Sequence, residues 1–223
     1  MDKAATSVAN PQARIRGANA LFVREFVRSP IRTASVVPSS RALAAMMCRP
    51  IELATRSGRD GTVVELGAGS GAFTEQLQRI AGDRIRHIAY ELNPAFATHL
   101  ARRYPAVEVI TADVAFLDTT LADRGIEQVD FVVSALPWSA YAGMRGPSLV
   151  RTVSRILGAQ GVFTQFTYAW SRWMPPARRQ HALLADSFRD VQTGRTVWAN
   201  FPPAFVYTAS GSKLMSGRTP WAR

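Results

Sequence analysis

The sequence predicts an α/β fold built on one mainly parallel β-sheet. From Gly61 onward, short apolar runs alternate with stretches of helical periodicity, which is the pattern of consecutive βαβ units. A glycine-rich turn directly follows the first of these runs, at residues 67–71. The chain of 223 residues is long enough for one such domain with a sizeable core, but too short for two large ones. We therefore expect a single α/β domain.

Seven apolar runs are expected to form strands. The first five should be Thr62–Leu66, His87–Glu91, Val107–Thr111, Val129–Ser134 and Gly161–Thr167. Helices are expected near Gly71–Ile80, Pro94–Arg102, Pro147–Leu157 and Pro176–Phe188. The last two runs flank Asn200-Phe201-Pro202-Pro203 and should close the sheet as a strand pair, with an antiparallel strand: Thr196–Ala199 and Ala204–Thr208.

Upstream of the sheet, the chain is expected to be helical. Arg14–Arg28 predicts an amphipathic helix with Phe22 and Phe26 on its apolar face, and Ser29-Pro30 should end it. A second helix is expected to begin after Ser39 or Ser40 as N-cap, to include Arg41–Met47, and to end before Pro50.

Composition narrows the class of protein. Lys and Arg number 27 against 16 acids, a net charge of +11, which favours a polyanionic partner such as nucleic acid or an anionic lipid surface. A genome rich in G and C would also enrich arginine. The single cysteine, Cys48, excludes an intrachain disulfide, and with three scattered histidines it makes no metal site. Because we find neither a signal peptide nor a membrane-spanning run, we expect a cytoplasmic protein, soluble or peripheral on a membrane.

The glycine-rich turn reads Val63-Val64-Glu65-Leu66-Gly67-Ala68-Gly69-Ser70-Gly71. Glycine there lets the backbone approach a ligand where a Cβ would clash. Gly67, Gly69 and Ala72 also fit the dinucleotide pattern G-x-G-x-x-G/A. The acid two residues before the first glycine, the third alternating glycine and the long upstream segment favour a different cofactor.

The E-x-G-x-G-x-G arrangement resembles motif I of class I methyltransferases. The resemblance implies a Rossmann-like fold with a seven-stranded sheet, and S-adenosylmethionine as cofactor. It implies that Glu65 orders the site around the cofactor's amino group. The turn residues would pack under its methionine part: Gly67, Ala68, Gly69 and Gly71.

Two further acids lie at the carboxyl ends of the next two expected strands: Glu91 ends the second, and Asp113 follows the third. Glu91 lies 24 residues after Gly67, where a carboxylate can accept hydrogen bonds from both ribose hydroxyls. In the methyltransferase family an acid at the position of Asp113 binds the adenine amino group, and the next backbone N–H, here that of Val114, binds the ring. Leu92, which directly follows Glu91, is also expected to contact the cofactor. The carboxyl edge of an open α/β sheet is where ligands bind, so we expect these residues to form one cofactor site.

The fourth expected strand ends in Val133-Ser134-Ala135-Leu136-Pro137-Trp138. This resembles the (N/D/S)-x-x-P-(aromatic) motif IV of enzymes that methylate nitrogen. The resemblance implies that backbone carbonyls of the turn, with Leu136 among its residues, and Ser134 beside the cofactor aim the amine at the methyl group. Trp138 would stack on the target or hold a methylated ammonium. The alternative is a β-turn with a packed tryptophan. Ser134 in place of Asn or Asp disfavours a nucleic-acid base.

Several segments together resemble the bacterial phospholipid N-methyltransferases, over about Phe22 to Tyr207. They are Phe26-Val27-Arg28-Ser29-Pro30, Val36-Val37-Pro38-Ser39-Ser40, Asp118-Thr119-Thr120-Leu121, Ser134-Ala135-Leu136-Pro137, Gln165-Phe166-Thr167-Tyr168 and Asn200-Phe201-Pro202-Pro203-Ala204. The implied reaction is methylation of the amine of phosphatidylethanolamine or of a related aminolipid. Tyr168 joins the expected catalytic residues. Three alternatives stay open for Tyr168, Trp170 and Trp173: an amphiphile pocket, a membrane interface or core.

Two other acceptors stay open: an adenine of ribosomal RNA and a small natural product. The enzymes that methylate rRNA adenines usually add a helical C-terminal domain, whereas this chain ends about 15 residues after its last expected strand. Nucleic acid is therefore not the expected partner, and the oligomeric state is left open. A non-enzymatic protein with the same cofactor fold is the remaining class.

The expected organisation follows from these assignments. Residues 1–56 form a helical appendage, either a membrane contact or a lid, residues 57–210 the S-adenosylmethionine-binding catalytic domain, and residues 211–223 a flexible tail. The helix Arg14–Arg28 can lie on an anionic bilayer surface with its phenylalanines in the headgroup region. It can equally pack on the sheet.

Overall fold

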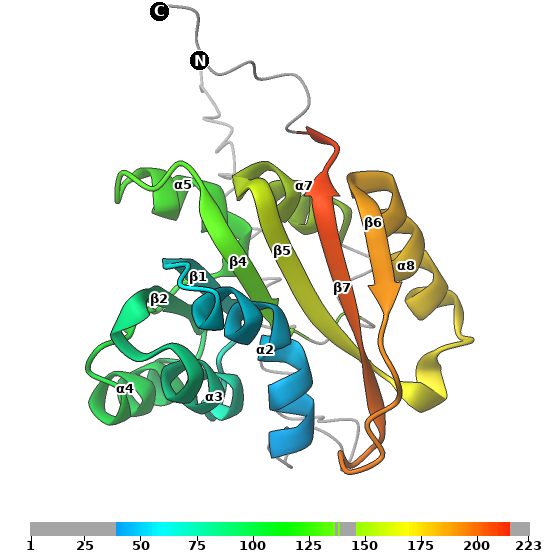
Figure 1. Ribbon diagram of the computed structural model, residues 1–223, viewed down its shortest axis with the longest axis horizontal. Coiled ribbons are helices and arrows are strands. Elements are labelled where there is room, and N and C mark those ends of the chain that lie inside the picture. The colour runs from blue at the N-terminus through cyan, green and yellow to red at the C-terminus, as the bar shows by residue number, and fades with distance from the viewer. Residues whose placement is uncertain (1–38, 137, 139–145, 215–223) are drawn as a thin grey trace, which may run out of the picture. The chain divides into compact units, whose positions relative to one another are not determined.

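The computed structural model describes residues 39–136, 138 and 146–214 (Figure 1). Seven strands form one sheet in the order β3-β2-β1-β4-β5-β7-β6. The strands are β1 (Gly61–Leu66), β2 (Ile85–Tyr90), β3 (Glu108–Ile110), β4 (Val129–Ser134), β5 (Leu157–Tyr168), β6 (Phe188–Thr193) and β7 (Ala204–Ser212). All ladders are parallel except the two that β7 forms with β5 and β6. The predicted mainly parallel seven-stranded sheet is confirmed.

Helices cover both faces of this sheet, as Figure 1 shows with α2 in front and α7 behind. Alternate residues of β1 divide between two cores: Val63 packs with the helices of one face, and Val64 with those of the other. The first face carries α2 (Arg41–Arg56), α3 (Ala72–Ala81) and α4 (Pro94–Arg103). The second carries α5 (Leu117–Ala122), α7 (Gly146–Ile156) and α8 (Pro175–Ser187). Three short 3-10 turns complete the framework: η1 (Gly82–Arg84), η2 (Val114–Phe116) and η3 (Ala169–Ser171).

The register of the parallel strands brings their carboxyl ends to one edge. Leu66 at the end of β1 pairs with Tyr90 of β2 and with Ser134 of β4, and Ser134 in turn pairs with Gln165 of β5. The antiparallel β7 begins at this edge, because Ala204 lies opposite Tyr168. The last residue of β3, Ile110, pairs with Tyr90, so the loops that follow all five parallel strands and the loop that precedes β7 meet along this carboxyl edge.

The helix expected to end before Pro50 continues to Arg56, so that expectation was wrong. Its apolar side chains Leu43, Met47 and Ile51 recur at four-residue intervals, and each is at most 1% exposed. Burial of such side chains contributes about 1.5–3 kcal/mol each, which together outweighs the cost of about 3 kcal/mol for an interior proline. The helix α2 belongs to the same compact unit as the sheet, because that unit begins at Ser39.

Pro50→Ala is expected to raise the free energy of unfolding by about 1–3 kcal/mol, because alanine restores an N–H donor inside α2 and removes the steric conflict of the proline ring. The opposing effect, a more flexible unfolded chain, is smaller, at about 0.4–1 kcal/mol. Urea denaturation of both proteins measures the difference. A lower midpoint for the alanine variant at an unchanged slope would contradict this expectation.

The closing strand pair also differs from the expectation. Besides β5, the antiparallel partner of β7 is β6, which begins at Phe188, whereas residues 196–199 contribute only one isolated bridge, from Val197 to Ala204. Phe188 was expected to end a helix, but its ring is 1% exposed and stacks on Phe163 with centroids 6.2 Å apart. This tertiary contact explains why the chain changes to strand there. The expected helix at Arg14–Arg28 and residues 215–223 of the expected tail lie outside the described residues.

Candidate active site

The turn after β1 has the backbone that the glycine motif predicted. Gly67 and Gly69 have φ angles of +74° and +55°, a region that side-chain-bearing residues rarely adopt. The N–H groups of Gly67 and Ala68 both donate to the Tyr90 carbonyl, at 2.8 and 3.1 Å, which ties the turn to the end of β2. A Cβ on Gly67 would lie 2.8 Å from Leu136 Cδ2, whereas one on Gly69 would meet only the Gly67 carbonyl oxygen, at 3.9 Å. The turn is thus closed toward the sheet and open on its other side.

Glu91 fixes this turn from the end of β2. Its Oε2 accepts a hydrogen bond from the Gly69 N–H at 2.7 Å, and its Oε1 accepts one from the Asn93 N–H at 2.8 Å. The side chain is buried, with 8% of its surface exposed. Each carboxylate oxygen can accept a further hydrogen bond. Glu91 therefore orders the glycine turn and keeps acceptor capacity for the ribose hydroxyls that the sequence assigned to it.

Glu65 lies entirely inside the protein, where two polar side chains contact it and a third contacts one of these two. Its Oε2 accepts hydrogen bonds from Thr74 Oγ1 at 2.7 Å and from His87 Nε2 at 3.0 Å. Gln78 Nε2 donates to the other ring nitrogen of His87 at 3.1 Å, so the imidazole proton that faces Glu65 is on Nε2. Sequence reasoning missed Thr74, Gln78 and His87. The available signal was the polar His87 directly before the apolar run Ile88–Tyr90, and His87 is paired in register with the apolar Val63.

The second oxygen of Glu65, Oε1, is buried and has no hydrogen-bond partner in the part of the chain that the structure describes. A buried carboxylate oxygen without a donor is costly unless a ligand or a water supplies one. The orphan acceptor beside an open glycine turn fits a ligand that carries an ammonium group. The residues present therefore fit the methionine part of S-adenosylmethionine.

Asp113 follows β3 at the same edge and serves as N-cap of η2. Its Oδ1 accepts a hydrogen bond from the Ala115 N–H at 2.9 Å. The next residue, Val114, is buried at 5% exposure, whereas Leu92 after β2 is 37% exposed. Since Glu91 and Asp113 follow adjacent paired strands, the structure brings both expected acids to the edge that carries the glycine turn.

Ser134 and Trp138 form a buried pair at the end of β4. Ser134 Oγ accepts hydrogen bonds from the Leu136 N–H at 3.3 Å and from Trp138 Nε1 at 3.0 Å. The Trp138 side chain is 2% exposed, and its ring meets Phe163 edge-on with centroids 5.9 Å apart. The ring packs in the core of this structure, which favours a packed tryptophan over one that stacks on the acceptor. Pro137 and residues 139–145 lie outside the described part of the chain.

Tyr168, at the end of β5, belongs to a run of aromatic side chains that begins beside the glycine turn. Phe73 in the first turn of α3 lies 6.0 Å from Phe166, which meets Tyr168 at 5.6 Å, and Tyr168 stacks on Trp170 at 6.5 Å, all between centroids. Burial raises the pKa of Tyr168 above its ordinary value. Its hydroxyl therefore stays protonated at neutral pH and can donate a hydrogen bond.

A buried amide pair next to Ser134 was also missed from sequence. Gln180 Nε2 on α8 donates to Gln165 Oε1 on β5 at 2.8 Å, and both side chains are at most 1% exposed. Gln165 Nε2 and Gln180 Oε1 lack hydrogen-bond partners among the described residues. The signal was a glutamine in the inner part of a predicted strand, one residue before Phe166. No cluster of His, Cys, Asp or Glu in the described ranges could hold a metal ion.

Comparisons with known proteins agree with this geometry. No family model matches the chain. An ornithine lipid N-methyltransferase of Singulisphaera acidiphila is 33% identical over 196 residues, covering 86% of this chain and 96% of that protein. A protein of Methanosarcina mazei named "Probable ribosomal RNA small subunit methyltransferase A" is 37% identical over 99 residues, which span 43% of this chain and 32% of that protein.

Among solved structures, human methyltransferase-like protein 13 in complex with SAH superposes with a TM-score of 0.55 at 16% identity, covering 81% of this chain and 83% of that one. This likeness shows the Rossmann-like methyltransferase fold. The Singulisphaera enzyme shares sequence over almost its whole length. The chain therefore belongs to the same family as that enzyme, and is a class I methyltransferase that depends on S-adenosylmethionine.

Proposed function

We propose that the protein transfers the methyl group of S-adenosylmethionine to the headgroup amine of an aminolipid, with ornithine lipid or phosphatidylethanolamine as acceptor. The observation that carries this proposal is the match to an ornithine lipid N-methyltransferase over 96% of that enzyme's length. The sequence Ser134-Ala135-Leu136-Pro137-Trp138, which resembles motif IV of nitrogen methyltransferases, also supports it. Ser134 of this motif lies at the carboxyl edge, beside the strand that carries the glycine turn.

The chain's residues have three tasks in such a reaction. S-adenosylmethionine supplies a methyl group on a positively charged sulfur, and the glycine turn with Glu65 and Glu91 binds and orients it. The Ser134 turn positions the amine so that its lone pair points along the S–CH₃ bond, which is catalysis by proximity and orientation. Backbone carbonyls at this turn would accept hydrogen bonds from the N–H groups of the neutral amine. Methyl transfer to that amine would leave the demethylated cofactor as a neutral thioether and a methylammonium product, whose extra proton passes to water.

The proposed location is the cytoplasmic side of a membrane, where the acceptor's headgroup is accessible to a peripheral protein. In the described residues, no helix is both long and apolar enough to span a bilayer. We further propose that the N-terminal segment, with its basic amphipathic stretch at 14–28, provides one membrane contact. Residues 57–210 carry the cofactor and acceptor sites.

A labelling experiment tests the acceptor class. The protein is incubated with S-adenosylmethionine labelled in the methyl group and with liposomes of ornithine lipid, liposomes of phosphatidylethanolamine, or ribosomal RNA. Label in either lipid supports the proposal and identifies the headgroup. Label only in RNA would favour methylation of ribosomal RNA, the second candidate function, which the partial match to the Methanosarcina protein supports.

The rate of the first methylation is expected to rise with pH, because only the neutral amine has a free lone pair. A primary alkyl amine of the lysine type has a pKa of about 10.4, so the neutral fraction grows about tenfold per pH unit between pH 7 and 9. Initial rates at saturating cofactor and limiting lipid measure this dependence. If chemistry limits turnover and the rate is nonetheless flat over this range, direct attack by the lipid amine is contradicted.

A further inference from the structure

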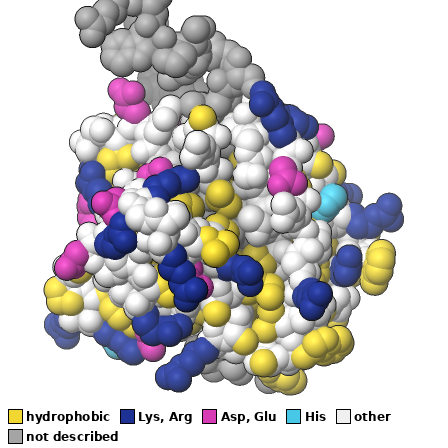
Figure 2. Space-filling model, viewed as in Figure 1, with side chains coloured by type: hydrophobic (Ala, Val, Ile, Leu, Met, Phe, Trp, Pro, Cys, Tyr) yellow, Lys and Arg dark blue, Asp and Glu magenta, His cyan; other side chains and the backbone are white. Residues whose placement is uncertain are grey.

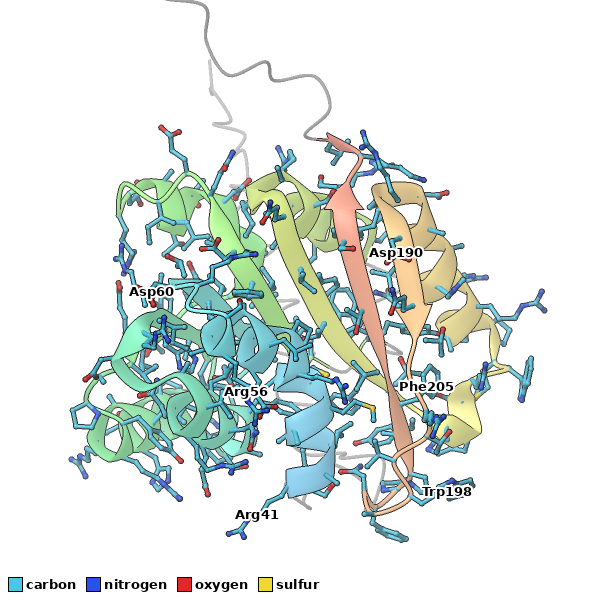
Figure 3. The ribbon with its side chains drawn as sticks, in the orientation of Figure 1. Arg41, Arg56, Asp60, Asp190, Trp198 and Phe205 are labelled. Atoms are coloured by element: carbon cyan, nitrogen blue, oxygen red, sulfur yellow. The ribbon has the colours of Figure 1, made fainter. Side chains whose placement is uncertain are left out.

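Five large apolar side chains are exposed in two loops, one that follows β5 and one that precedes β7. Trp173 is 80% exposed, Trp198 78% and Phe201 73%, and Trp170 and Met174 are 54% and 44% exposed. An isolated apolar side chain on a surface is ordinary, but a group of this size marks a binding surface. We call these five residues the aromatic surface. Figure 2 shows apolar side chains gathered at the lower right of the molecule, where Figure 3, in the same orientation, labels Trp198.

Backbone contacts hold the two loops together. The Ala169 N–H donates to the Pro203 carbonyl at 2.8 Å, and Val197 bridges to Ala204, which itself pairs with Tyr168. Asn200 further anchors the second loop, since its side chain accepts a hydrogen bond from the Ser40 N–H at 2.9 Å. The aromatic surface is thus presented by tethered loops. In Figure 3 Trp198 lies at the end of the molecule where Arg41 marks the beginning of α2.

The charge around the aromatic surface has one sign. Residues 169–185 and 191–212 contain no aspartate or glutamate, while Arg172, Arg178, Arg179 and Arg195 are all exposed there. Within the described residues no ion pair involves these four arginines. The Arg172 guanidinium instead lies over the rings of Trp173 and Phe205, at 5.4 Å from each centroid. Such a surface complements a negatively charged partner that also has an apolar layer.

We propose that the aromatic surface docks the catalytic domain on an anionic lipid bilayer. Tryptophan is enriched at membrane interfaces, where an apolar ring and a polar N–H are both satisfied, and arginines are drawn to anionic headgroups. Trp170 of this surface stacks on Tyr168, at the end of the aromatic run that begins beside the glycine turn. Docking there places the cofactor edge against the headgroups. This inference rests on the proposed lipid substrate and names the surface that reaches it.

Single-stranded RNA is the competing partner, because bases also stack on exposed aromatic rings between arginines. The side chains favour the bilayer. Met174 offers no flat ring for a base, and Trp198 and Phe201 protrude from a short loop with three-quarters of their surface free. Protruding apolar side chains at loop tips can enter a headgroup layer, whereas a strand of RNA is bound along a groove.

The test is a flotation assay of the full chain with vesicles of phosphatidylcholine and phosphatidylglycerol. The triple variant Trp173→Ser/Trp198→Ser/Phe201→Ser is expected to lower vesicle partitioning at least tenfold, because large apolar side chains no longer enter the interface. The matched control Leu53→Ser/Phe96→Ser removes two exposed apolar side chains outside the aromatic surface, and it should bind vesicles within twofold of the unchanged protein. Arg178→Gln/Arg195→Gln should weaken binding less, and added salt should mimic that loss.

Binding of the triple variant within twofold of the unchanged protein would overturn the proposal, as would equal losses in the triple variant and its matched control. The proposal would also be overturned if the triple variant lost RNA binding but kept vesicle binding. Flotation needs no acceptor, so it measures docking even if no aminolipid is methylated. Failure of the docking proposal can therefore be distinguished from failure of the proposed function. With an active protein, the triple variant should lose methylation of bilayer lipid at least tenfold, yet keep its cofactor affinity and its rate on a monomeric short-chain aminolipid.

Discussion

Two changes in the cofactor site, Gly67→Val and Glu91→Ala, are each expected to weaken S-adenosylmethionine binding at least tenfold. Valine at position 67 would have to adopt a φ near +74° with its Cβ 2.8 Å from Leu136 Cδ2. A β-branched residue is strongly disfavoured at positive φ, so the turn would change its path. Glu91→Ala removes the acceptor of the Gly69 and Asn93 N–H groups together with the proposed ribose acceptor.

Matched variants separate loss of the site from general damage. Gly125 has a φ of +67° and no atom within 4 Å of its ideal Cβ, so Gly125→Val imposes similar backbone strain away from the edge. Glu75→Ala removes an exposed carboxylate that pairs with Arg103 on the protein's surface. Both controls should bind the cofactor within twofold of the unchanged protein in calorimetry. Wild-type affinity in both site variants, or tight binding of NAD, would refute this assignment of the cofactor site.

The features predictable from sequence were those that short segments determine. A buried strand followed by G-x-G-x-G requires a tight turn, and the alternation of strands and helices requires parallel pairing. Parallel pairing in turn brings residues that follow neighbouring strands to one edge. This is why Glu91 and Asp113 both lie at the edge that carries the turn, although they are 22 residues apart in the sequence.

The features that sequence could not supply depend on contacts between distant segments. Pro50 is tolerated within α2 because the helix is buried along the sheet, which no local rule anticipates. The pairing of β7 with β6 depends on the contact between Phe188 and Phe163, and the Ser40 N–H is bound by Asn200, 160 residues away. An aromatic residue in motif IV is equally compatible with a ligand contact and with core packing. Only the surroundings of Trp138 distinguish the two.

Trp138→Ala is expected to lower the free energy of unfolding by about 3–5 kcal/mol, the cost of truncating a buried aromatic side chain. The ring is 2% exposed and packs edge-on against Phe163, which itself stacks on Phe188, so the change would leave a cavity within one aromatic group. A shift of this size in the urea midpoint, at an unchanged slope, measures the effect. Turnover of this variant is informative only at temperatures where it remains folded.

Trp138→Phe distinguishes a packing role from an acceptor-binding role. Phenylalanine keeps an aromatic ring but lacks the N–H that donates to Ser134 Oγ, a loss of about 1 kcal/mol. Because Ser134 Oγ still accepts from the Leu136 N–H, the turn should stay in place and the KM for the lipid should change less than threefold. The opposite outcome has two parts: Trp138→Ala leaves stability unchanged, and both variants raise the KM for the acceptor tenfold or more. It would mean that the indole leaves the core and contacts the amine. In that case the buried position of Trp138 could not be the one that binds substrate.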